Sequence, residues 1–354
     1  MFIRMIQYIT PYLNFKYHRR KEIEEYLEHC QLDLTNKDNT IDMNVAREYV
    51  RSVPAMYNYC IEFRLLFDWH FANATIRIPE KQAHPLFIFQ QQLMYAFCKH
   101  YNLDYQFWQF FIFHAHVNVR GKSLLEIGGS LPNEMIFDLF GVEKYINTES
   151  PDYIVAESGN PYTKKHDQHE RRQTLFVNAE HIHKEIPGNT IDLVFSVACF
   201  EHIYDLDSAL ASCYEVQKDK GFLYSYFAPI YSYLIDGHHH VIPTHSDLKD
   251  GVQVGFHLLN NKDQRKQLEN AGISNPKDIQ AFLGAVNFDR VPNRMYYEDY
   301  SRILTESNYR VIRMEDLPNY NISKQYPDEV ARIRKSNPEI RNLHSMGYRV
   351  LLQK

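Results

Sequence analysis

The stretch 123-SLLEIGGS-130 decides the fold, because it joins an apolar run to a carboxylate and a pair of glycines. Residues 123–127 have the length and apolar character of a buried β-strand. Glu126 lies near the end of this run, and Gly128 and Gly129 follow it. A glycine pair after a strand indicates that the backbone must come close to another group. Glu126 argues against a phosphate as that group, since two anions at one place repel each other.

Short apolar runs alternate with helical segments beyond this stretch. The runs are KYINTE (144–149), TLFVNAE (174–180), IDLVFSV (191–197) and GFLYSYF (221–227). Strands that alternate with helices predict βαβ units and a parallel sheet that is covered on both faces. Residues 309–317 and 347–354 predict two more strands, and the last one closes the sheet. The predicted fold is therefore α/β, a Rossmann-like, seven-stranded, mostly parallel sheet with helices on both faces.

The N-terminal third of the chain has a different pattern, in which aromatic residues recur at helical spacing. It predicts a helical region over residues 1–117, either a separate domain or a cap, before the α/β domain at 118–354. Residues 1–15, MFIRMIQYITPYLNF, are apolar but are interrupted by Arg4 and Pro11. Because of this interruption we expect no membrane span or signal peptide here, and instead a helix that docks on its own domain.

The composition is that of a globular protein, with 354 residues, 44% of them hydrophobic, and a formal net charge of −5. Such a charge gives no electrostatic footprint for a nucleic acid. The five cysteines are scattered and form no C-x-x-C pair, which is typical of reduced thiols. We therefore expect a soluble, cytoplasmic protein with no membrane span and no nucleic-acid partner.

Two classes of cofactor use a strand, a glycine turn and a helix: dinucleotides and S-adenosylmethionine. A dinucleotide site needs G-x-G-x-x-G, so that the pyrophosphate can lie on the helix N-terminus. Residues 128–133 read GGSLPN, and Glu126 would face that pyrophosphate. S-adenosylmethionine carries a sulfonium and an ammonium group and no phosphate, so a carboxylate at Glu126 favours it. Gly128 and Gly129 would let the backbone approach its methionine part.

Further polar and small residues follow the other predicted strands, in the order that such a cofactor needs. Glu149 ends the second strand, where a carboxylate can accept both ribose hydroxyls. Asn178 and Ala179 follow the third strand, in a place to meet the adenine edge. Ser196 starts the segment SVACFEH, which leaves the fourth strand at the middle of the same rim.

Five segments in this order, SLLEIGGS, YINTES, FVNAEHI, IDLVFSVACFEHI and GFLYSYFAP, resemble class I S-adenosylmethionine-dependent methyltransferases. The resemblance covers residues 122–229, and FEHI is similar to the element of the branch that acts on small molecules, quinones and sugars. It implies a methyltransferase that methylates a hydroxyl of a sugar, saccharide or other small metabolite. Two departures stand out: Ser130 replaces the second spaced glycine of the family's turn, and Asn178 replaces an acid.

A hydroxyl acceptor needs a proton acceptor with a pKa near neutral, which histidine provides. His202 follows the fourth strand, where it is either the base or a structural residue beside Glu201. His238 and His239 lie in an insertion predicted at residues 236–300, which forms a lid or binds the substrate. The pattern PIYS…GHH resembles sugar-tailoring relatives and makes His238 or His239 the base or a substrate ligand. The alternative is a solvated loop whose histidines only form hydrogen bonds.

The segment VPNRMYYEDY (291–300) resembles a family segment near the substrate. Arg294 is predicted to hold a phosphate or carboxylate of the acceptor, or else to pair with Glu298 or Asp299 on the surface. Tyr231, in PIYS, is predicted as a second substrate-binding residue. His257 has apolar neighbours, which favour a histidine of the core.

The sequence argues against three alternatives. A metal site at Asp236 and the following histidines is not predicted, because no second acid–histidine pair stands at ligand spacing. A non-catalytic interaction module would have no use for the ribose-binding acid at Glu149. A nucleic-acid methyltransferase conflicts with the net charge, and SVACF stands where many amino-methylating enzymes have N/D-P-P-Y/F.

Overall fold

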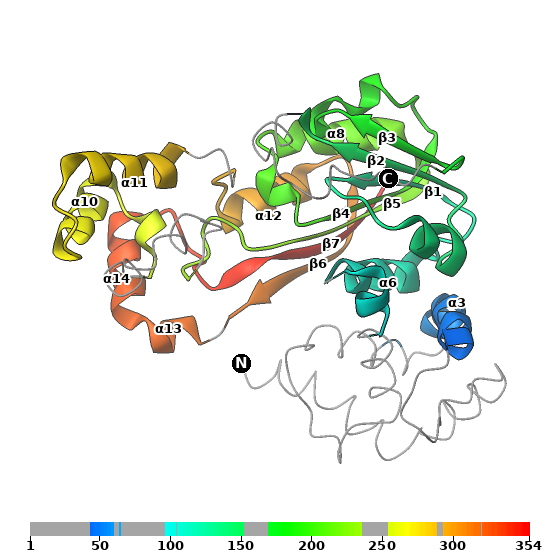
Figure 1. Ribbon diagram of the computed structural model, residues 1–354, viewed down its shortest axis with the longest axis horizontal. Helices are drawn as coiled ribbons and strands as arrows, with labels where there is room; N and C mark the ends of the chain where they lie inside the picture. The colour runs from blue at the N-terminus through cyan, green and yellow to red at the C-terminus, as the bar shows by residue number, and fades with distance from the viewer. Residues whose placement is uncertain are drawn as a thin grey trace, which may run out of the picture. The chain divides into compact units, whose positions relative to one another are not determined.

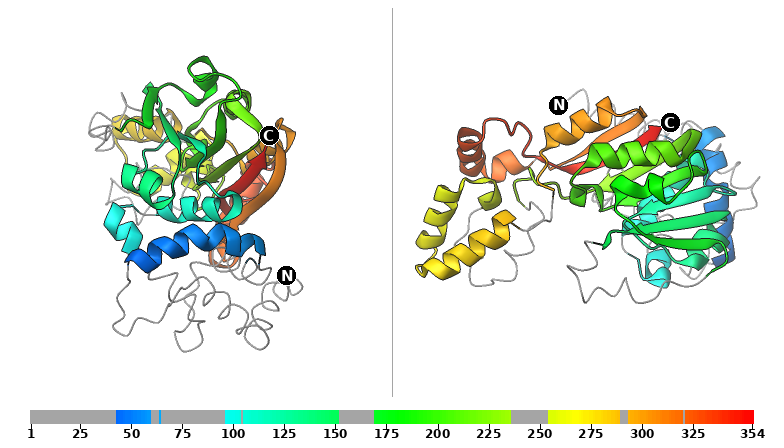
Figure 2. Two further views of the ribbon diagram at one scale, coloured as in Figure 1. Left: turned by 90° about the vertical axis from the view of Figure 1, so that its right-hand side faces the viewer. Right: turned by 90° about the horizontal axis from the view of Figure 1, so that it is seen from above.

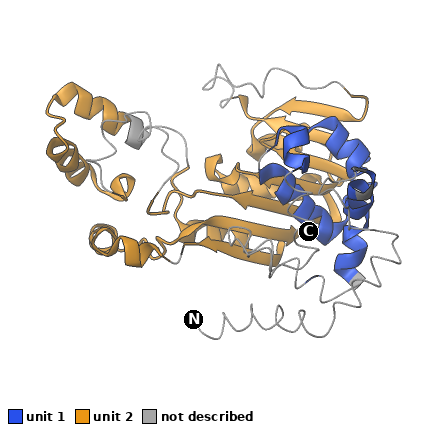
Figure 3. Ribbon diagram, turned by 60° about the horizontal axis from the view of Figure 1, so that its bottom comes forward, with its two compact units in different colours: residues 1–122, 131–143 blue, residues 123–130, 144–354 orange. Residues whose placement is uncertain are grey.

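The computed structural model describes residues 43–59, 64, 96–103, 105–151, 169–235, 254–288, 293–319 and 321–354 (Figure 1). The chain divides into two compact units (Figure 3), one of residues 1–122 and 131–143 and the other of residues 123–130 and 144–354. The docking helix predicted for residues 1–15 lies outside the described residues. The domain boundary predicted after residue 117 stays a prediction.

The second unit is built on a sheet in which seven of the described strands follow the order β3-β2-β1-β4-β5-β7-β6. Strands β1 to β5 pair in parallel, and β7 pairs antiparallel with both β5 and β6. This confirms the predicted Rossmann-like, mostly parallel sheet. The strands are β1 (Ser123–Ile127), β2 (Lys144–Glu149), β3 (Arg172–Phe176), β4 (Ile191–Val197), β5 (Gln217–Phe227), β6 (Arg310–Pro318) and β7 (Ser345–Gln353).

The last two strands differ in one respect from the sequence prediction, which expected the final strand to close the sheet. Strand β7 instead lies between β5 and β6, and β6 forms the edge. The burial patterns explain this order. Six of the nine residues of β7 are buried in one run from Gly347 onward, whereas β6 has exposed residues at Arg310, Ile312 and Asp316. A strand with neighbours on both sides needs the more apolar sequence.

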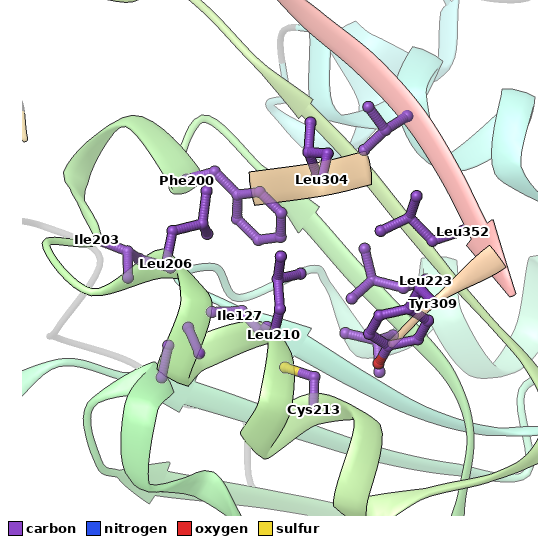
Figure 4. Close-up of a cluster of buried hydrophobic side chains, with 14 of the residues drawn as sticks. Ile127, Phe200, Ile203, Leu206, Leu210, Cys213, Leu223, Leu304, Tyr309 and Leu352 are labelled. Carbon is purple, nitrogen blue, oxygen red and sulfur yellow. The ribbon is translucent and has the colours of Figure 1, made fainter. Parts of the chain in front are cut away.

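One face of the sheet packs against η4 (Ala179–Lys184), α8 (Leu206–Val216) and α12 (Tyr297–Glu306). Figure 4 shows Leu206, Leu210 and Cys213 of α8 pointing at Ile127, Leu223 and Leu352 of the strands. Their spacing of three and four residues puts them on one side of the helix. Asp205 fixes the start of α8, because its carboxylate accepts a hydrogen bond from the Ser208 N–H at 3.0 Å.

The insertion after β5 is helical in its described parts, which include η7 (Phe256–Leu258), α10 (Asn261–Asn270) and α11 (Pro276–Phe288). Together with α13 (Ile322–Gln325) and α14 (Pro327–Ser336), these elements gather beyond one end of the sheet (Figures 1 and 2). Two small cores hold the group together. One joins Tyr231 and Leu258 to Ile333, and the other joins Phe256 to Leu268 and Phe282.

The first unit contains α3 (Met43–Tyr59), α6 (Tyr105–Val117), a further helical segment at residues 96–101, and the π-helix η2 (Glu134–Leu139). Its core is aromatic, with Phe107 and Phe110 fully buried and packed against the ring of Phe140. His114 joins α6 to α3, since its Nε2 lies 3.0 Å from the Val50 carbonyl. Burial lowers the pKa of His114 to about 3, so this histidine is neutral.

No helix within the described part of the chain has the length and apolar character needed to cross a membrane.

Candidate functional site

The register of the parallel strands puts both predicted acids on the same face of the sheet. Glu126 in β1 stands opposite Asn147 in β2, so the two side chains point to the same face. Glu149 lies two residues beyond Asn147 and points to that face as well. Glu126 is buried with 3% of its surface exposed, and Glu149 is half-buried. Two carboxylates therefore lie at the carboxyl ends of neighbouring strands.

The turn after β1 needs glycine at two successive positions. Gly128 has a φ of +69°, in the left-handed region, and its N–H donates to the Thr148 carbonyl at 3.0 Å. A Cβ at Gly128 would overlap the Sγ of Cys199, which follows β4. A Cβ at Gly129 would overlap the Oε1 of Glu126. The turn is thus packed between Glu126 on one side and Cys199 on the other.

Glu126 takes part in a buried polar network that the sequence reading did not identify. The Tyr145 hydroxyl donates to Oε2 of Glu126, and the guanidinium of Arg172 lies 5.0 Å from the centre of the Tyr145 ring. Arg172 also donates to the Ser130 hydroxyl and, at 3.2 Å, to Oδ1 of Asn147. Ser130, which departs from the family's glycine, therefore gives the turn an anchor to β3. The alternation of polar residues along KYINTE (144–149) was the one sequence signal that could have indicated this network.

The remaining predicted cofactor residues lie beside these strand ends. Ser196 is fully buried, and its hydroxyl donates to the Ile127 carbonyl at 3.3 Å. Asn178 precedes η4, and its Oδ1 accepts a hydrogen bond from the Ser150 hydroxyl at 2.7 Å. Ala179 begins η4 and is buried. All of these residues belong to the second unit.

The turn after β4 carries the residues closest to the glycine turn. Ala198 has a φ of +51°, which is unusual for a residue with a side chain and marks local strain. Burial raises the pKa of the Cys199 thiol to about 12, and the charge of Glu201 contributes to the increase. The thiol therefore stays protonated and is not a nucleophile. His202 is half-buried at the end of η5 (Phe200–His202). His202 thus lies on the short helix that follows β4, and its role stays a prediction.

Glu201, between them, is fully buried. Among the described residues, no group forms a hydrogen bond of good geometry with either carboxylate oxygen. Burial raises the pKa of Glu201 to about 8, while the N–H groups of Glu201 and Ala228 lower it in part. At neutral pH this carboxyl group is therefore mostly protonated, and it adds little negative charge to the rim.

Arg294 and Tyr231, the two predicted substrate-binding residues, lie together. The Arg294 guanidinium is 6.0 Å from the centre of the Tyr231 ring, at cation–π distance. Tyr231 is held by His257: its hydroxyl donates to the His257 carbonyl at 2.8 Å, and Nε2 of His257 lies 3.1 Å from the Tyr231 carbonyl. His257 is 3% exposed, which agrees with the prediction of a core histidine.

The predicted bases His238 and His239 lie outside the described residues. Asp236 lies outside the described residues as well, so the expectation of no metal site in that segment stays a prediction. Within the described ranges, no group of three or more His, Cys, Asp or Glu side chains could hold a metal ion. The described geometry brings the glycine turn together with the two strand-end carboxylates, and it separately brings Arg294 to Tyr231.

Comparison with known proteins agrees with this arrangement. Residues 152–225 match the family model described as a methyltransferase domain. The match supports an S-adenosylmethionine-dependent methyltransferase and S-adenosylmethionine as its cofactor. No curated protein sequence matches this chain significantly.

Among solved structures, an S-adenosylmethionine-dependent methyltransferase from Mesorhizobium loti is 11% identical, covering 67% of this chain and 93% of its own, with a TM-score of 0.35. One from Archaeoglobus fulgidus is 14% identical, covering 74% and 99%, with a TM-score of 0.36. Phosphoethanolamine N-methyltransferase 2 from Haemonchus contortus, solved with S-adenosylmethionine, is 12% identical, covering 66% and 49%, with a TM-score of 0.35. These similarities are too low to support a conclusion about the substrate.

Proposed function

We propose that this protein transfers a methyl group from S-adenosylmethionine to a hydroxyl group of a sugar, saccharide or other small metabolite. The observation that carries the proposal is the pairing of two strand-end acids with a glycine turn, next to the segment that matches the methyltransferase model. A cationic, phosphate-free ligand is the one whose charge suits this rim.

In the proposed complex, the residues of the rim divide the cofactor between them. Gly128 and Gly129 give the methionine part room to approach the backbone, and Glu126 lies behind them as the counter-charge of its ammonium group. Glu149 accepts hydrogen bonds from the ribose hydroxyls. Asn178 and Ala179, at the start of η4, border the adenine, and Ser196 holds the end of β1 in register.

The cofactor would supply an electrophilic methyl group on a sulfonium. The protein's own task is to align the acceptor oxygen with that methyl group and to exclude water. The acceptor hydroxyl loses its proton to a histidine as the new carbon–oxygen bond forms and the carbon–sulfur bond breaks. The candidate bases are His202 at the rim and His238 or His239 in the insertion, and we propose His238 or His239 for this role.

The acceptor would bind at Arg294 and Tyr231. A guanidinium beside an aromatic ring suits a molecule with an anionic group and a sugar face, such as a sugar phosphate or a sugar acid. Burial raises the pKa of Tyr231 to about 12, so its hydroxyl stays neutral and keeps its hydrogen bond to the His257 carbonyl, while the ring is the part offered to the acceptor. We also propose a reducing, cytoplasmic setting, which the reduced thiols of the half-buried Cys199 and the buried Cys213 support.

Isothermal titration calorimetry with S-adenosylmethionine and S-adenosylhomocysteine tests the proposal. We expect both to bind at micromolar concentrations, and NAD⁺ not to bind. A folded protein that binds neither nucleoside contradicts the proposed function.

The Glu149→Gln variant tests the ribose contact, because it removes one negative charge with little change in size. We expect a 10- to 100-fold loss of affinity for S-adenosylhomocysteine, since hydrogen bonds to a charged acceptor contribute about 1.5–3 kcal/mol. Glu215→Gln, at an exposed position on α8, makes the same change of charge away from the strand ends and should leave affinity unchanged. Equal affinities for the two variants would remove Glu149 from the site.

A further inference from the structure

Asn293 begins the last described segment of the insertion, and its contacts reach back to the turn after β4. Its side-chain amide donates to the carbonyl of Phe200 at 2.9 Å and to that of Ile203 at 2.7 Å. Its backbone N–H donates to the carbonyl of Glu201 at 2.7 Å. Three carbonyls of one short turn are thus bound by a single residue that lies 93 positions from Phe200 in the sequence.

The other side of the Asn293 amide is also fully used. Its Oδ1 accepts a hydrogen bond from the Tyr300 hydroxyl at 2.7 Å and one from the Met295 N–H at 3.1 Å. A primary amide has two donors and two acceptor sites, and here all four are occupied. Asn293 is 9% exposed and Tyr300 is fully buried, so these bonds are shielded from water.

Asparagine is the one side chain of this length that offers such a set of bonds. Aspartate would face two carbonyl oxygens with a carboxylate and no donor, and leucine would leave the carbonyls without these partners. Asparagine is needed at position 293 to join the two segments, and not to fold either one. Residues 198–203 and residues 293–300 each have backbone hydrogen bonds of their own.

The two ends of this bridge are the two halves of the candidate site. On one end, the turn continues from Cys199, whose thiol packs against the glycine turn. On the other end, Arg294 follows directly; its φ is +60°, and its guanidinium lies 6.0 Å from the centre of the Tyr231 ring. The Tyr296 ring stacks on the Tyr231 ring, with their centres 6.1 Å apart.

We infer that Asn293 is the positioning residue that fixes the acceptor side, defined as Tyr231, His257, Arg294 and Tyr296, to the turn at residues 198–203 beside the cofactor site. The inference rests on the proposed function in assigning a ligand to each side. Methyl transfer depends on the alignment of two bound molecules. Asn293 acts on that alignment through the turn and touches neither reacting group.

Hydrogen–deuterium exchange of the full-length protein tests the inference, first without a ligand. In Asn293→Ala, we expect exchange to rise at least ten-fold together in residues 200–203 and in residues 230–234 and 293–297, while β1 and β4 keep wild-type rates. Asn260→Ala is the matched control. Its side chain caps α10 by accepting hydrogen bonds from Lys262 and Asp263, so exchange should rise at α10 alone. A rise confined to residues 200–203 in Asn293→Ala overturns the inference.

The same measurement with S-adenosylhomocysteine separates positioning from a purely structural role. In the wild-type protein, we expect the ligand to slow exchange in residues 200–203 and in residues 293–297. In Asn293→Ala, with affinity within three-fold of wild type, it should slow exchange in residues 200–203 alone. Protection of residues 293–297 that persists in this variant overturns the inference.

The experiment distinguishes a failure of the proposed function from a failure of the inference about Asn293. If S-adenosylhomocysteine does not bind the wild-type protein, the proposed function fails, and the exchange data without ligand still decide whether Asn293 joins the two segments. If Asn293→Ala does not fold, Tyr300→Phe replaces it, because that change removes one bond to Oδ1 and keeps the ring. The expected and the contradicting results are the same for both variants.

Discussion

The two sides of the candidate site are built in different ways. On the strand-end side, each residue belongs to a strand or to the turn directly after it, and the sheet register alone brings Glu126, Gly128 and Glu149 together. On the acceptor side, Tyr231, His257 and Arg294 come from three separate segments and are held by side-chain contacts. A site of the first kind follows from topology, whereas a site of the second kind depends on individual bonds.

This difference has an energetic counterpart. The strand-end side tolerates little change, because the glycine turn is packed against Cys199 and Glu126 without room for a methyl group. The acceptor side belongs to a small core formed by residues such as Leu234, Leu258 and Ile333, which is distinct from the main core under α8. Small cores bury less apolar surface and contribute less stability. We therefore expect large effects of substitution at the turn and modest ones around Tyr231.

The largest effect is expected for Gly128→Ala. The added methyl group would overlap the Cys199 thiol and would force a positive φ on alanine, so we expect a loss of about 2–4 kcal/mol in the free energy of unfolding. Binding of S-adenosylhomocysteine should fall more than 100-fold. Chemical denaturation and calorimetry measure the two quantities.

Cys199→Ala in the Gly128→Ala background sharpens this prediction. Removing the thiol relieves the overlap and leaves the backbone strain, so we expect partial recovery of stability. Stability that is unchanged by the second substitution would show that packing against Cys199 does not define the turn.

The next effect is a pH dependence that arises from Glu201. Burial raises its folded pKa to about 8, above the value near 4.5 of an exposed glutamate, so the folded protein binds a proton that the unfolded chain releases. The contribution of Glu201 to the free energy of unfolding is therefore fully present below pH 4.5. It decreases as the pH rises from 4.5 through 8. The slope approaches about 1.4 kcal/mol per pH unit in that window.

Glu201→Gln checks this slope, because glutamine keeps the size of the side chain and does not titrate. We expect the variant to gain stability relative to wild type as the pH rises from 5 to 8, as measured by urea denaturation at several pH values. Parallel pH profiles of the two proteins would mean that Glu201 is ionised in the fold.

The smallest effect is expected for Tyr231→Phe on the acceptor side. It removes the hydrogen bond to the His257 carbonyl and keeps the ring over which Arg294 lies, so the free energy of unfolding should fall by about 1 kcal/mol. Affinity for S-adenosylhomocysteine should stay within two-fold of wild type. Tyr231→Leu, which also removes the ring, should cost more. If Tyr231→Phe weakened cofactor binding ten-fold, cofactor binding at the strand ends would depend on the acceptor side, which contradicts the distinction between the two.

The same contrast explains how much of the molecule could be predicted from its sequence. Strands β1, β2 and β4 begin and end at the predicted residues, because apolar runs bounded by turns are a local signal. The side-by-side positions of Glu126 and Glu149 follow from the parallel register. The place of β7 between β5 and β6 was not predicted, since it depends on which strand can be buried on both sides.

Residues that act across long distances in the sequence escaped prediction. Asn293 forms its bonds with carbonyls 90 and 93 residues earlier, and backbone carbonyls leave no mark in the amino-acid sequence. Arg172 reaches Ser130 across 42 residues, and Tyr145 reaches Glu126 across 19. These contacts are set by tertiary packing, for which a single sequence carries no local pattern.

The central claim is that the rim after β1 and β2 binds a cationic nucleoside. A crystal structure of the complex with S-adenosylhomocysteine tests it most directly. We expect the amino-acid part of the ligand to lie against Gly128 and Gly129 and its ribose hydroxyls to lie within hydrogen-bond distance of Glu149. A ligand bound elsewhere, with Glu149 turned away from any bound molecule, would contradict it.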